Sequence, residues 1–256
     1  MDVILFASPL NPLSAVAADF FWKEGFLKVL VIPQGLPGGL MKAGPILFFS
    51  KLSTGLYRYF HVLLRMAGLK RSKNYSCLLE FMRSHTTVPV IEFYPGMPIE
   101  QRLRKELGEV ALSNCLIFAC VFRYKIPADF VRNRYAVNVH PGILPDNRGP
   151  NAYFWALATK QNESGLTFHV LEERIDEGSI LMLRTFLIQP RFSEYRLERL
   201  SAETLRNCLP YFWANFMKLW ENSSPQGKGV YYKEPDYRTR RKYRRLSFLN
   251  LADFLE

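Results

Sequence analysis

The stretch that decides the fold, residues 135–150, reads Tyr-Ala-Val-Asn-Val-His-Pro-Gly-Ile-Leu-Pro-Asp-Asn-Arg-Gly-Pro. Its first six residues form an apolar run of strand length that stops at Pro141, because proline cannot donate a hydrogen bond to a sheet ladder. Asn138 and His140 lie two residues apart, so their side chains leave the same face of the strand. The stretch therefore predicts a strand whose carboxyl end presents an amide and an imidazole side by side.

Six other apolar runs of strand length lie before and after this one. They occupy residues 3–7, 26–33, 88–93, 115–121, 166–171 and 179–188. Residues 99–112 and 194–221 have apolar positions at helical spacing and are predicted to be helices. Strands that alternate with helices are typical of parallel βαβ units. We therefore expect an α/β fold with a mostly parallel, doubly wound sheet and a ligand site at the carboxyl ends of its strands.

The predicted domain organisation is one main domain followed by a shorter extension. The chain has 256 residues, which suits a single large domain with a small addition. We assign residues 1–190 to the main, catalytic domain and residues 191–256 to a helical and basic C-terminal extension. Residues 36–75 interrupt the alternation of strands and helices, and we interpret them as an insertion that begins in a loop rich in glycine and proline.

The chain is strongly basic, since 34 Lys and Arg against 23 Asp and Glu give a net charge of +11. This balance favours an anionic partner, such as a nucleotide, a polyglutamylated cofactor, RNA or an anionic membrane surface. Two segments concentrate the charge: residues 51–73 have the pattern of a basic amphipathic helix, and residues 238–245 read Arg-Thr-Arg-Arg-Lys-Tyr-Arg-Arg. Each is compatible with binding to RNA, a membrane surface or a carrier protein, and also with a solvated outer face.

Cysteine usage and hydropathy indicate the compartment. Cys77, Cys115, Cys120 and Cys208 form no C-x-x-C pair, which favours buried free thiols in a reducing environment, and we expect no metal. The N-terminal apolar run lacks a preceding basic region, and no stretch is apolar for long enough to span a bilayer. We expect a cytoplasmic protein, peripheral to the inner membrane if its basic segments bind lipid.

Asn138, His140 and Asp176 are the candidate catalytic residues. When an amine attacks a formyl carbon, negative charge develops on the carbonyl oxygen, and the Asn138 amide and a protonated His140 can both donate hydrogen bonds to it. Asp176, two residues before Gly178 in the loop between two predicted strands, supplies a carboxylate to hold the imidazole, raise its pKa and relay the amine's proton. Each motif alone is also compatible with an ordinary turn. We interpret His169 as a hydrogen-bonded histidine behind the site.

Four motifs in order resemble the folate-dependent formyltransferase family: a strand ending Asn-x-His-Pro, a Leu-Pro-x-x-Arg-Gly loop, a Gly-x-Thr strand and an Asp-x-Gly turn. The matching residues are Asn138, His140, Pro141, Leu144, Pro145, Arg148, Gly149, Gly165, Thr167, Asp176 and Gly178. The family includes methionyl-tRNA, glycinamide ribonucleotide and nucleotide-sugar formyltransferases. The resemblance, which is close over residues 88–190, implies a Rossmann-like domain, 10-formyltetrahydrofolate as the formyl donor, and catalytic roles for Asn138, His140 and Asp176.

The same resemblance places the two substrates. It implies that the pterin of the donor lies between the loop at residues 121–127 and the loop at residues 171–176. The residues assigned to the donor are Phe122, Arg123, Tyr124, Lys125, Ile126, Leu171 and Ile175. Of these, the basic pair Arg123 and Lys125 would meet the glutamate tail of the folate or stay in a solvated loop. The residues assigned to the acceptor side and its loops are Pro141, Leu144, Arg148, Gly149, His169 and Gly178.

The acceptor is less well defined than the donor. Glycinamide ribonucleotide enzymes carry a glycine-rich phosphate loop after the first strand, whereas residues 8–12 here read Ser-Pro-Leu-Asn-Pro and have few free N–H groups to bind phosphate. The chain after Pro190 is also shorter than the C-terminal barrel of methionyl-tRNA enzymes. We expect formyl transfer to the primary amine of a small metabolite or a nucleotide-linked amino sugar. A methionyl-tRNA formyltransferase-like enzyme, a formyltetrahydrofolate hydrolase and a non-catalytic RNA or membrane binder are the alternatives.

Overall fold

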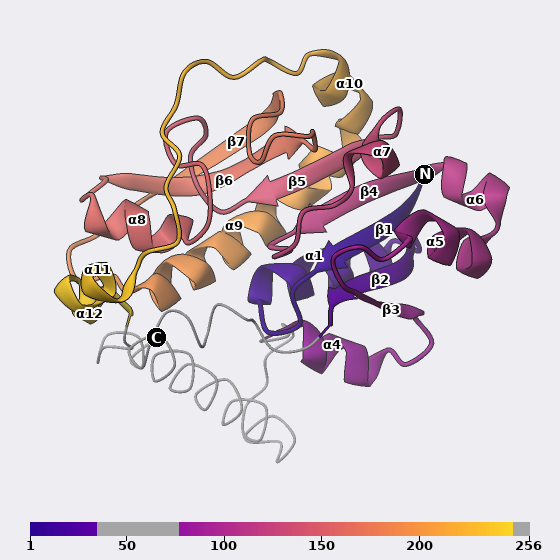
Figure 1. Ribbon diagram of the computed structural model, residues 1–256, viewed down its shortest axis with the longest axis horizontal. Helices are drawn as coiled ribbons and strands as arrows, with labels where there is room; N and C mark the ends of the chain where they lie inside the picture. Colours follow the sequence, from indigo (N-terminus) through magenta and orange to yellow (C-terminus); the bar gives the residue numbers. More distant parts are fainter. Residues whose placement is uncertain (35–76, 248–256) are drawn as a thin grey trace.

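A computed structural model describes residues 1–34 and 77–247 of the chain (Figure 1). Seven strands form one sheet in the order β3-β2-β1-β4-β5-β6-β7. Neighbouring strands are parallel from β3 to β5, and β6 and β7 are antiparallel. The strands are β1 (Asp2–Ala7), β2 (Leu27–Pro33), β3 (Val90–Phe93), β4 (Cys115–Cys120), β5 (Ala136–His140), β6 (Glu163–Val170) and β7 (Ile180–Leu187). The predicted α/β fold and all seven predicted strands are confirmed, while the predictions for residues 36–75 and 51–73 lie outside the described residues.

Helices cover both faces of the sheet because β1 is apolar and buried at every position after Asp2. Val3 and Leu5 pack into a core under α1 (Pro12–Lys23), α4 (Leu78–Ser84) and α9 (Glu194–Ala214). Ile4 and Phe6 point the other way, into a core under α5 (Ile99–Leu107), α6 (Glu109–Ser113) and α7 (Ala128–Val131). Successive side chains of a strand leave opposite faces, so a fully apolar strand requires both faces to be covered.

Two helices predicted as continuous are each broken in two. The prediction over residues 99–112 is wrong at Gly108, which has φ +80° and separates α5 from α6, because a positive φ ends a helix whatever the apolar spacing around it. The prediction over residues 194–221 is wrong at Asn215, which caps α9 and precedes α10 (Phe216–Glu221). Local backbone conformation, and not the spacing of apolar residues, sets both ends.

The chain after α10 returns to the site end of the sheet. An extended segment, residues 223–234, which we call the strap, runs from α10 past α8 (Ala152–Ala158) to α11 (Tyr237–Lys242) and α12 (Arg244–Ser247) (Figure 1). Ser224 exchanges two backbone hydrogen bonds with Ile180 of β7, at 2.8 and 2.9 Å. Farther along, Tyr231 forms a parallel bridge with Arg148 in the loop after β5. The strap is therefore fixed to the sheet at one end and to this loop at the other.

The packing of α9 on β6 generates a test of the core. Phe212 is fully buried and stacks on Phe168 of β6 with ring centroids 4.5 Å apart. Phe212→Ala should lower the free energy of unfolding by about 3–5 kcal/mol, because it removes buried apolar surface and leaves a cavity. Tyr211, next to it on the same helix, is 52% exposed, so Tyr211→Ala should cost less than about 1 kcal/mol. Urea denaturation of both variants measures the difference, and equal losses would contradict this packing.

Candidate active site

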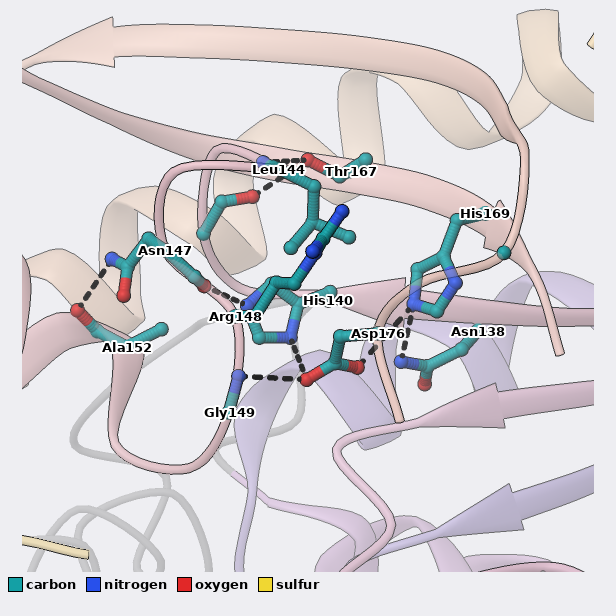
Figure 2. Close-up of polar contacts among 12 residues, drawn as sticks. Asn138, His140, Leu144, Asn147, Arg148, Gly149, Ala152, Thr167, His169 and Asp176 are labelled. Carbon is teal, nitrogen blue, oxygen red and sulfur yellow. Dashed lines mark hydrogen bonds and ion pairs between the residues drawn. The ribbon is translucent and has the colours of Figure 1, made fainter. Parts of the chain in front are cut away.

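Four polar side chains from three segments meet at the end of β5 (Figure 2). Asn138 and His140 come from β5, His169 from β6, and Asp176 from the loop between β6 and β7. The antiparallel register pairs Asn138 directly with His169, which puts their side chains on the same face of the sheet. Asn138 is half-buried, whereas His140, His169 and Asp176 are all buried. The amide is therefore the member of the group that a ligand can reach.

The Asn138 amide is held in one orientation by His169. Nδ1 of His169 lies 2.9 Å from the carbonyl oxygen of Val170, which can only accept, so Nδ1 carries the proton. In the neutral ring Nε2 then accepts, and Nδ2 of Asn138 donates to it at 3.0 Å. An amide nitrogen has two protons, so this contact leaves one N–H of Asn138 free for a ligand.

The carboxylate of Asp176 joins the two histidines and the loop after β5. Its Oδ2 accepts a hydrogen bond from the backbone N–H of Gly149 at 2.9 Å and lies 3.5 Å from Nδ1 of His140. Its Oδ1 lies 3.5 Å from Nε2 of His169. Asp176 has φ +56°, a conformation that aspartate tolerates better than most residues. The Asp176 carboxylate thus lies beside His140, where the sequence predicted it.

In the contact between Asp176 and His140, the pKa of each group is lowered, which favours a charged carboxylate and an uncharged ring. Burial raises the pKa of Asp176, but the neighbouring His140 and His169 and the Gly149 N–H together outweigh it and lower the pKa to about 2. Burial also dominates at His140 and lowers its pKa, although the Asp176 charge and the Asn147 carbonyl act in the opposite direction. A lowered pKa favours the neutral ring of His140 beside the charged carboxylate; the protonated His140 expected from the sequence stays a prediction.

Each ring nitrogen of His140 faces an acceptor oxygen. Its Nε2 lies 2.7 Å from the carbonyl oxygen of Asn147, so the neutral ring carries its proton there and leaves Nδ1 facing the Asp176 carboxylate. A second proton on Nδ1 would give both ring nitrogens an acceptor.

The loop residues predicted from the sequence lie around this group. The Leu144 N–H donates to the Thr167 hydroxyl at 3.2 Å, and that hydroxyl donates to the Gly142 carbonyl at 2.7 Å, so the chain after Pro141 is tied to β6. Gly149 supplies the N–H for Asp176; it has φ +95° and packs against the strap, leaving no space for a Cβ. Gly178 packs as closely on the carbonyl group of Val170.

The sequence motifs did not identify Asn147 or Gln226 as residues near the site. The guanidinium of Arg148 contacts Gln226 of the strap, with Nε and Nη2 at 3.1 and 2.9 Å from its Oε1. Asn147, which supplies the carbonyl for His140, is buried, and its side chain donates to the carbonyl of Ala152 at 3.0 Å. Asn147 occupies an unspecified position of the Leu-Pro-x-x-Arg-Gly motif, and Gln226, outside every motif, lies 78 residues after Arg148 in the chain. Only the folded structure brings them to the site.

The two loops predicted to hold a folate lie against the same core. Phe122, Tyr124 and Leu171 are half-buried and pack on the cluster that contains Ile126. The Arg123 side chain is tied back, donating to the carbonyl of Gln34 at 2.6 Å and to the Tyr124 hydroxyl at 2.9 Å. Lys125 and Ile175 are exposed. Residues 121–127 lie between the end of β4 at Cys120 and the start of α7 at Ala128. The backbone amides of this loop are therefore not part of the sheet ladder.

The basic segment at residues 238–245 is only partly on the surface. Arg240 is fully buried; its guanidinium pairs with Glu194 at 3.2 Å, donates to Asn151 Oδ1 at 2.7 Å and lies 4.8 Å from the ring centre of Phe154. Arg240 thus anchors α11 to the domain. Exposed positions of the segment are Arg238, Arg241, Lys242 and Arg245.

Three further findings concern the sequence-based expectations. Cys77, Cys115, Cys120 and Cys208 are all free and buried, as predicted. Within residues 1–34 and 77–247, no helix is long and apolar enough to cross a membrane. The same residues contain no group of three His, Cys, Asp or Glu side chains arranged to hold a metal ion.

The depressed pKa of Asp176 predicts a pH-dependent contribution to stability. A carboxyl group shifted from 3.8 to about 2 stabilises the fold by about 2 kcal/mol above its unfolded pKa, and this contribution is lost as the pH falls towards the folded value. The difference in unfolding free energy between the wild type and Asp176→Asn should therefore narrow from about pH 6 to about pH 3. Denaturant titrations at several pH values measure it, with the exposed Asp146→Asn as the control for loss of one charge. A difference that does not change with pH would contradict an ionised Asp176.

Comparison with known proteins finds similarity to enzymes that handle formyl groups. A GDP-perosamine N-formyltransferase of Brucella melitensis is 29% identical over 84 residues, covering 32% of each chain. A methionyl-tRNA formyltransferase of Myxococcus xanthus is 31% identical over 136 residues, covering 48% of this chain and 43% of its own length. The chain thus matches less than half of the length of these curated relatives.

A similar fold is found in an N-formyltransferase from Helicobacter canadensis, solved with folinic acid and dTDP-3-aminofucose. The two structures superpose with a TM-score of 0.59 at 14% identity, over 92% of this chain and 72% of the other. The Rossmann-like formyltransferase fold is therefore confirmed. The model of the formyl transferase family matches residues 71–211, more than half of the sequence and the part that contains β3 to β7 and all four site side chains. The chain belongs to the formyl transferase family.

Proposed function

We propose that the protein transfers a formyl group from 10-formyltetrahydrofolate to the primary amine of a nucleotide-linked amino sugar. The observation that carries the proposal is the half-exposed Asn138 amide, placed over a buried Asp176 carboxylate that lies 3.5 Å from both His140 and His169. Family membership supplies the reaction class. The site supplies the two functions that the reaction needs, an N–H donor and a proton acceptor.

The donor fits the residues that line the predicted folate loops. Phe122, Tyr124 and Leu171 present half-buried apolar surface from two loops that share one core, which suits the flat ring system of a pterin. The backbone of residues 121–127 offers amide groups for its polar edge. When bound, 10-formyltetrahydrofolate supplies an activated formyl group that an amine can attack without an enzyme nucleophile. The Helicobacter relative, solved with folinic acid, supports a folate in this fold.

Asn138 is assigned to the developing negative charge. One N–H of its amide is used by His169, and the other is free to donate to the formyl oxygen as the amine bonds to the formyl carbon. A donor fixed in advance stabilises the tetrahedral oxyanion without reorganisation during the reaction. His169 thus acts through Asn138, because it determines which amide atom faces the ligand.

His140 and Asp176 are assigned to the proton. The attacking amine becomes cationic as its new C–N bond forms and must lose a proton before the formamide is complete. A neutral His140 accepts that proton, directly or through water, and the Asp176 carboxylate stabilises the resulting imidazolium. The C–N bond to the folate then breaks, and the proton returns to the folate nitrogen. His140 therefore ends the cycle neutral, which is its resting form.

The acceptor is assigned on the relatives. Both the Brucella GDP-perosamine enzyme and the Helicobacter enzyme solved with dTDP-3-aminofucose handle amino sugars attached to nucleotides. The match to the Myxococcus methionyl-tRNA formyltransferase is longer, at 136 residues, and makes methionyl-tRNA the second candidate acceptor. The excess positive charge of the chain suits a phosphate-bearing acceptor of either kind.

An assay with labelled 10-formyltetrahydrofolate separates these possibilities. The panel contains GDP-perosamine, dTDP-3-aminofucose, methionyl-tRNA and a reaction without amine. Label should appear in a nucleotide sugar. Label in methionyl-tRNA would select the second candidate, and steady release of formate without amine would identify a hydrolase.

Substitutions at the site test the assigned roles with the acceptor found in that panel. Asn138→Ala should lower kcat by about 100- to 1,000-fold, because the oxyanion loses a fixed donor. His140→Gln should lower kcat by about 100-fold or more, since the proton acceptor is lost. Asn162→Ala, at an exposed position before β6, is the matched control and should leave kcat unchanged. Near-wild-type transfer by either site variant would contradict the assignment.

A further inference from the structure

The side chain of Gln226 connects the strap with both loops of the site. Its Nε2 donates to the backbone carbonyl of Asp176 at 3.0 Å and to that of Gly178 at 2.7 Å. Its Oε1 accepts from Nε and Nη2 of Arg148 at 3.1 and 2.9 Å. Both ends of the carboxamide are therefore used, each on a different loop.

These contacts close a ring of hydrogen bonds around the catalytic carboxylate. Arg148 is followed directly by Gly149, whose N–H donates to Asp176 Oδ2 at 2.9 Å. Gln226 holds the backbone of Asp176 on one side and the side chain of Arg148 on the other. The ring thus runs from Gln226 to Asp176, Gly149 and Arg148 and back to Gln226. A closed ring restrains its members more than the same bonds made separately, because no member can move without breaking two of them.

The backbone of the strap fixes Gln226 from both sides. Two residues earlier, Ser224 pairs with Ile180 through two hydrogen bonds. One residue later, the Gly227 carbonyl accepts from Arg148 Nη2 at 3.0 Å. Beyond it, Val230 exchanges backbone hydrogen bonds with the loop after β5, donating to the Pro145 carbonyl and accepting from the Arg148 N–H. The strap therefore presents the Gln226 carboxamide in one place.

We propose that Gln226 is a positioning residue that fixes the Asp176 carboxylate against His140 and His169. Its importance for catalysis rests on the proposed function, but the placement of the carboxylate can be measured without any substrate. Arg148 is the second half of the device, because its guanidinium fixes which end of the Gln226 carboxamide faces the Asp176 loop. The strap thereby sets the position of the Asp176 carboxylate, although the strap itself supplies no reacting atom.

The test uses Gln226→Met, which keeps the length of the side chain and removes all four hydrogen bonds, and Gln226→Glu, which keeps an acceptor for Arg148 and removes both donors. Exposed Gln189, after β7, provides the matched control Gln189→Glu. The first readout is the titration of the His140 ring by NMR, assigned with His140→Gln. Because the Asp176 charge raises the pKa of His140, displacement of the carboxylate should lower that pKa in Gln226→Met and leave it unchanged in the control. Gln226→Glu adds a negative charge of its own, so its readout is kcat.

A double-mutant cycle separates positioning from a general effect on stability. In an Asp176→Asn background the carboxylate charge is already absent, so Gln226→Met should not lower the pKa of His140 further. With substrates, both Gln226 variants should lose about 10- to 100-fold in kcat with a smaller change in KM, since misplacement of a catalytic group by about 1 Å has effects of this size.

An unchanged His140 titration in folded Gln226→Met would overturn the proposal, and so would an equal fall in the Asp176→Asn background. If the titration shifts as expected while no amine is formylated, the positioning role stands and the proposed function fails.

Discussion

The buried carboxylate of Asp176 is the contact on which the rest of the site depends. A charge removed from water is costly unless hydrogen bonds and opposite or polar groups replace the solvent. Here the replacements come from three separate parts of the chain: the Gly149 N–H after β5, His169 of β6 and His140 of β5. Together these groups outweigh the effect of burial on the pKa of the carboxylate. Its low pKa therefore reflects the correct assembly of β5, β6 and two loops.

The switch from parallel to antiparallel strands makes this assembly possible. The sheet is parallel as far as β5, and its strand ends would ordinarily supply catalytic residues from loops alone. Because β6 runs back beside β5, His169 lies opposite Asn138 within the sheet, where the backbone ladder fixes both positions. The donor amide is thus carried by a strand and oriented by a neighbouring strand. Of these side chains, only Asp176 comes from a loop, and Gln226 of the strap donates hydrogen bonds to the backbone of that loop.

Sequence and structure agree where the signal is local. Apolar runs predicted all seven strands, since a strand buried on both faces needs apolar residues at successive positions. Gly108 and Asn215 break helices whose apolar spacing continues past them, so periodicity alone could not place the breaks. The ordered motifs, through their resemblance to a family, brought Asn138, His140 and Asp176 to one site. They could not show that burial lowers the pKa of His140, because burial depends on the whole fold.

Gln226 shows why part of the site was beyond sequence reasoning. A single glutamine after a proline has no periodicity, no metal-binding spacing and no catalytic motif, and its partners lie about 50 and 78 residues earlier in the chain. Its meaning comes from the path of the strap, which no local pattern encodes. Arg148 was predicted from its motif, but its partner was not.

The position of the strap in the sequence also sets the order in which the molecule becomes complete. All seven strands precede residue 223, so a chain emerging from the ribosome can form its entire sheet before the strap has been synthesised. Until then Asp176 has its strand neighbours but lacks the ring that holds its loop. In the nascent protein the strands of the sheet are therefore available for pairing before the residues that restrain the Asp176 loop.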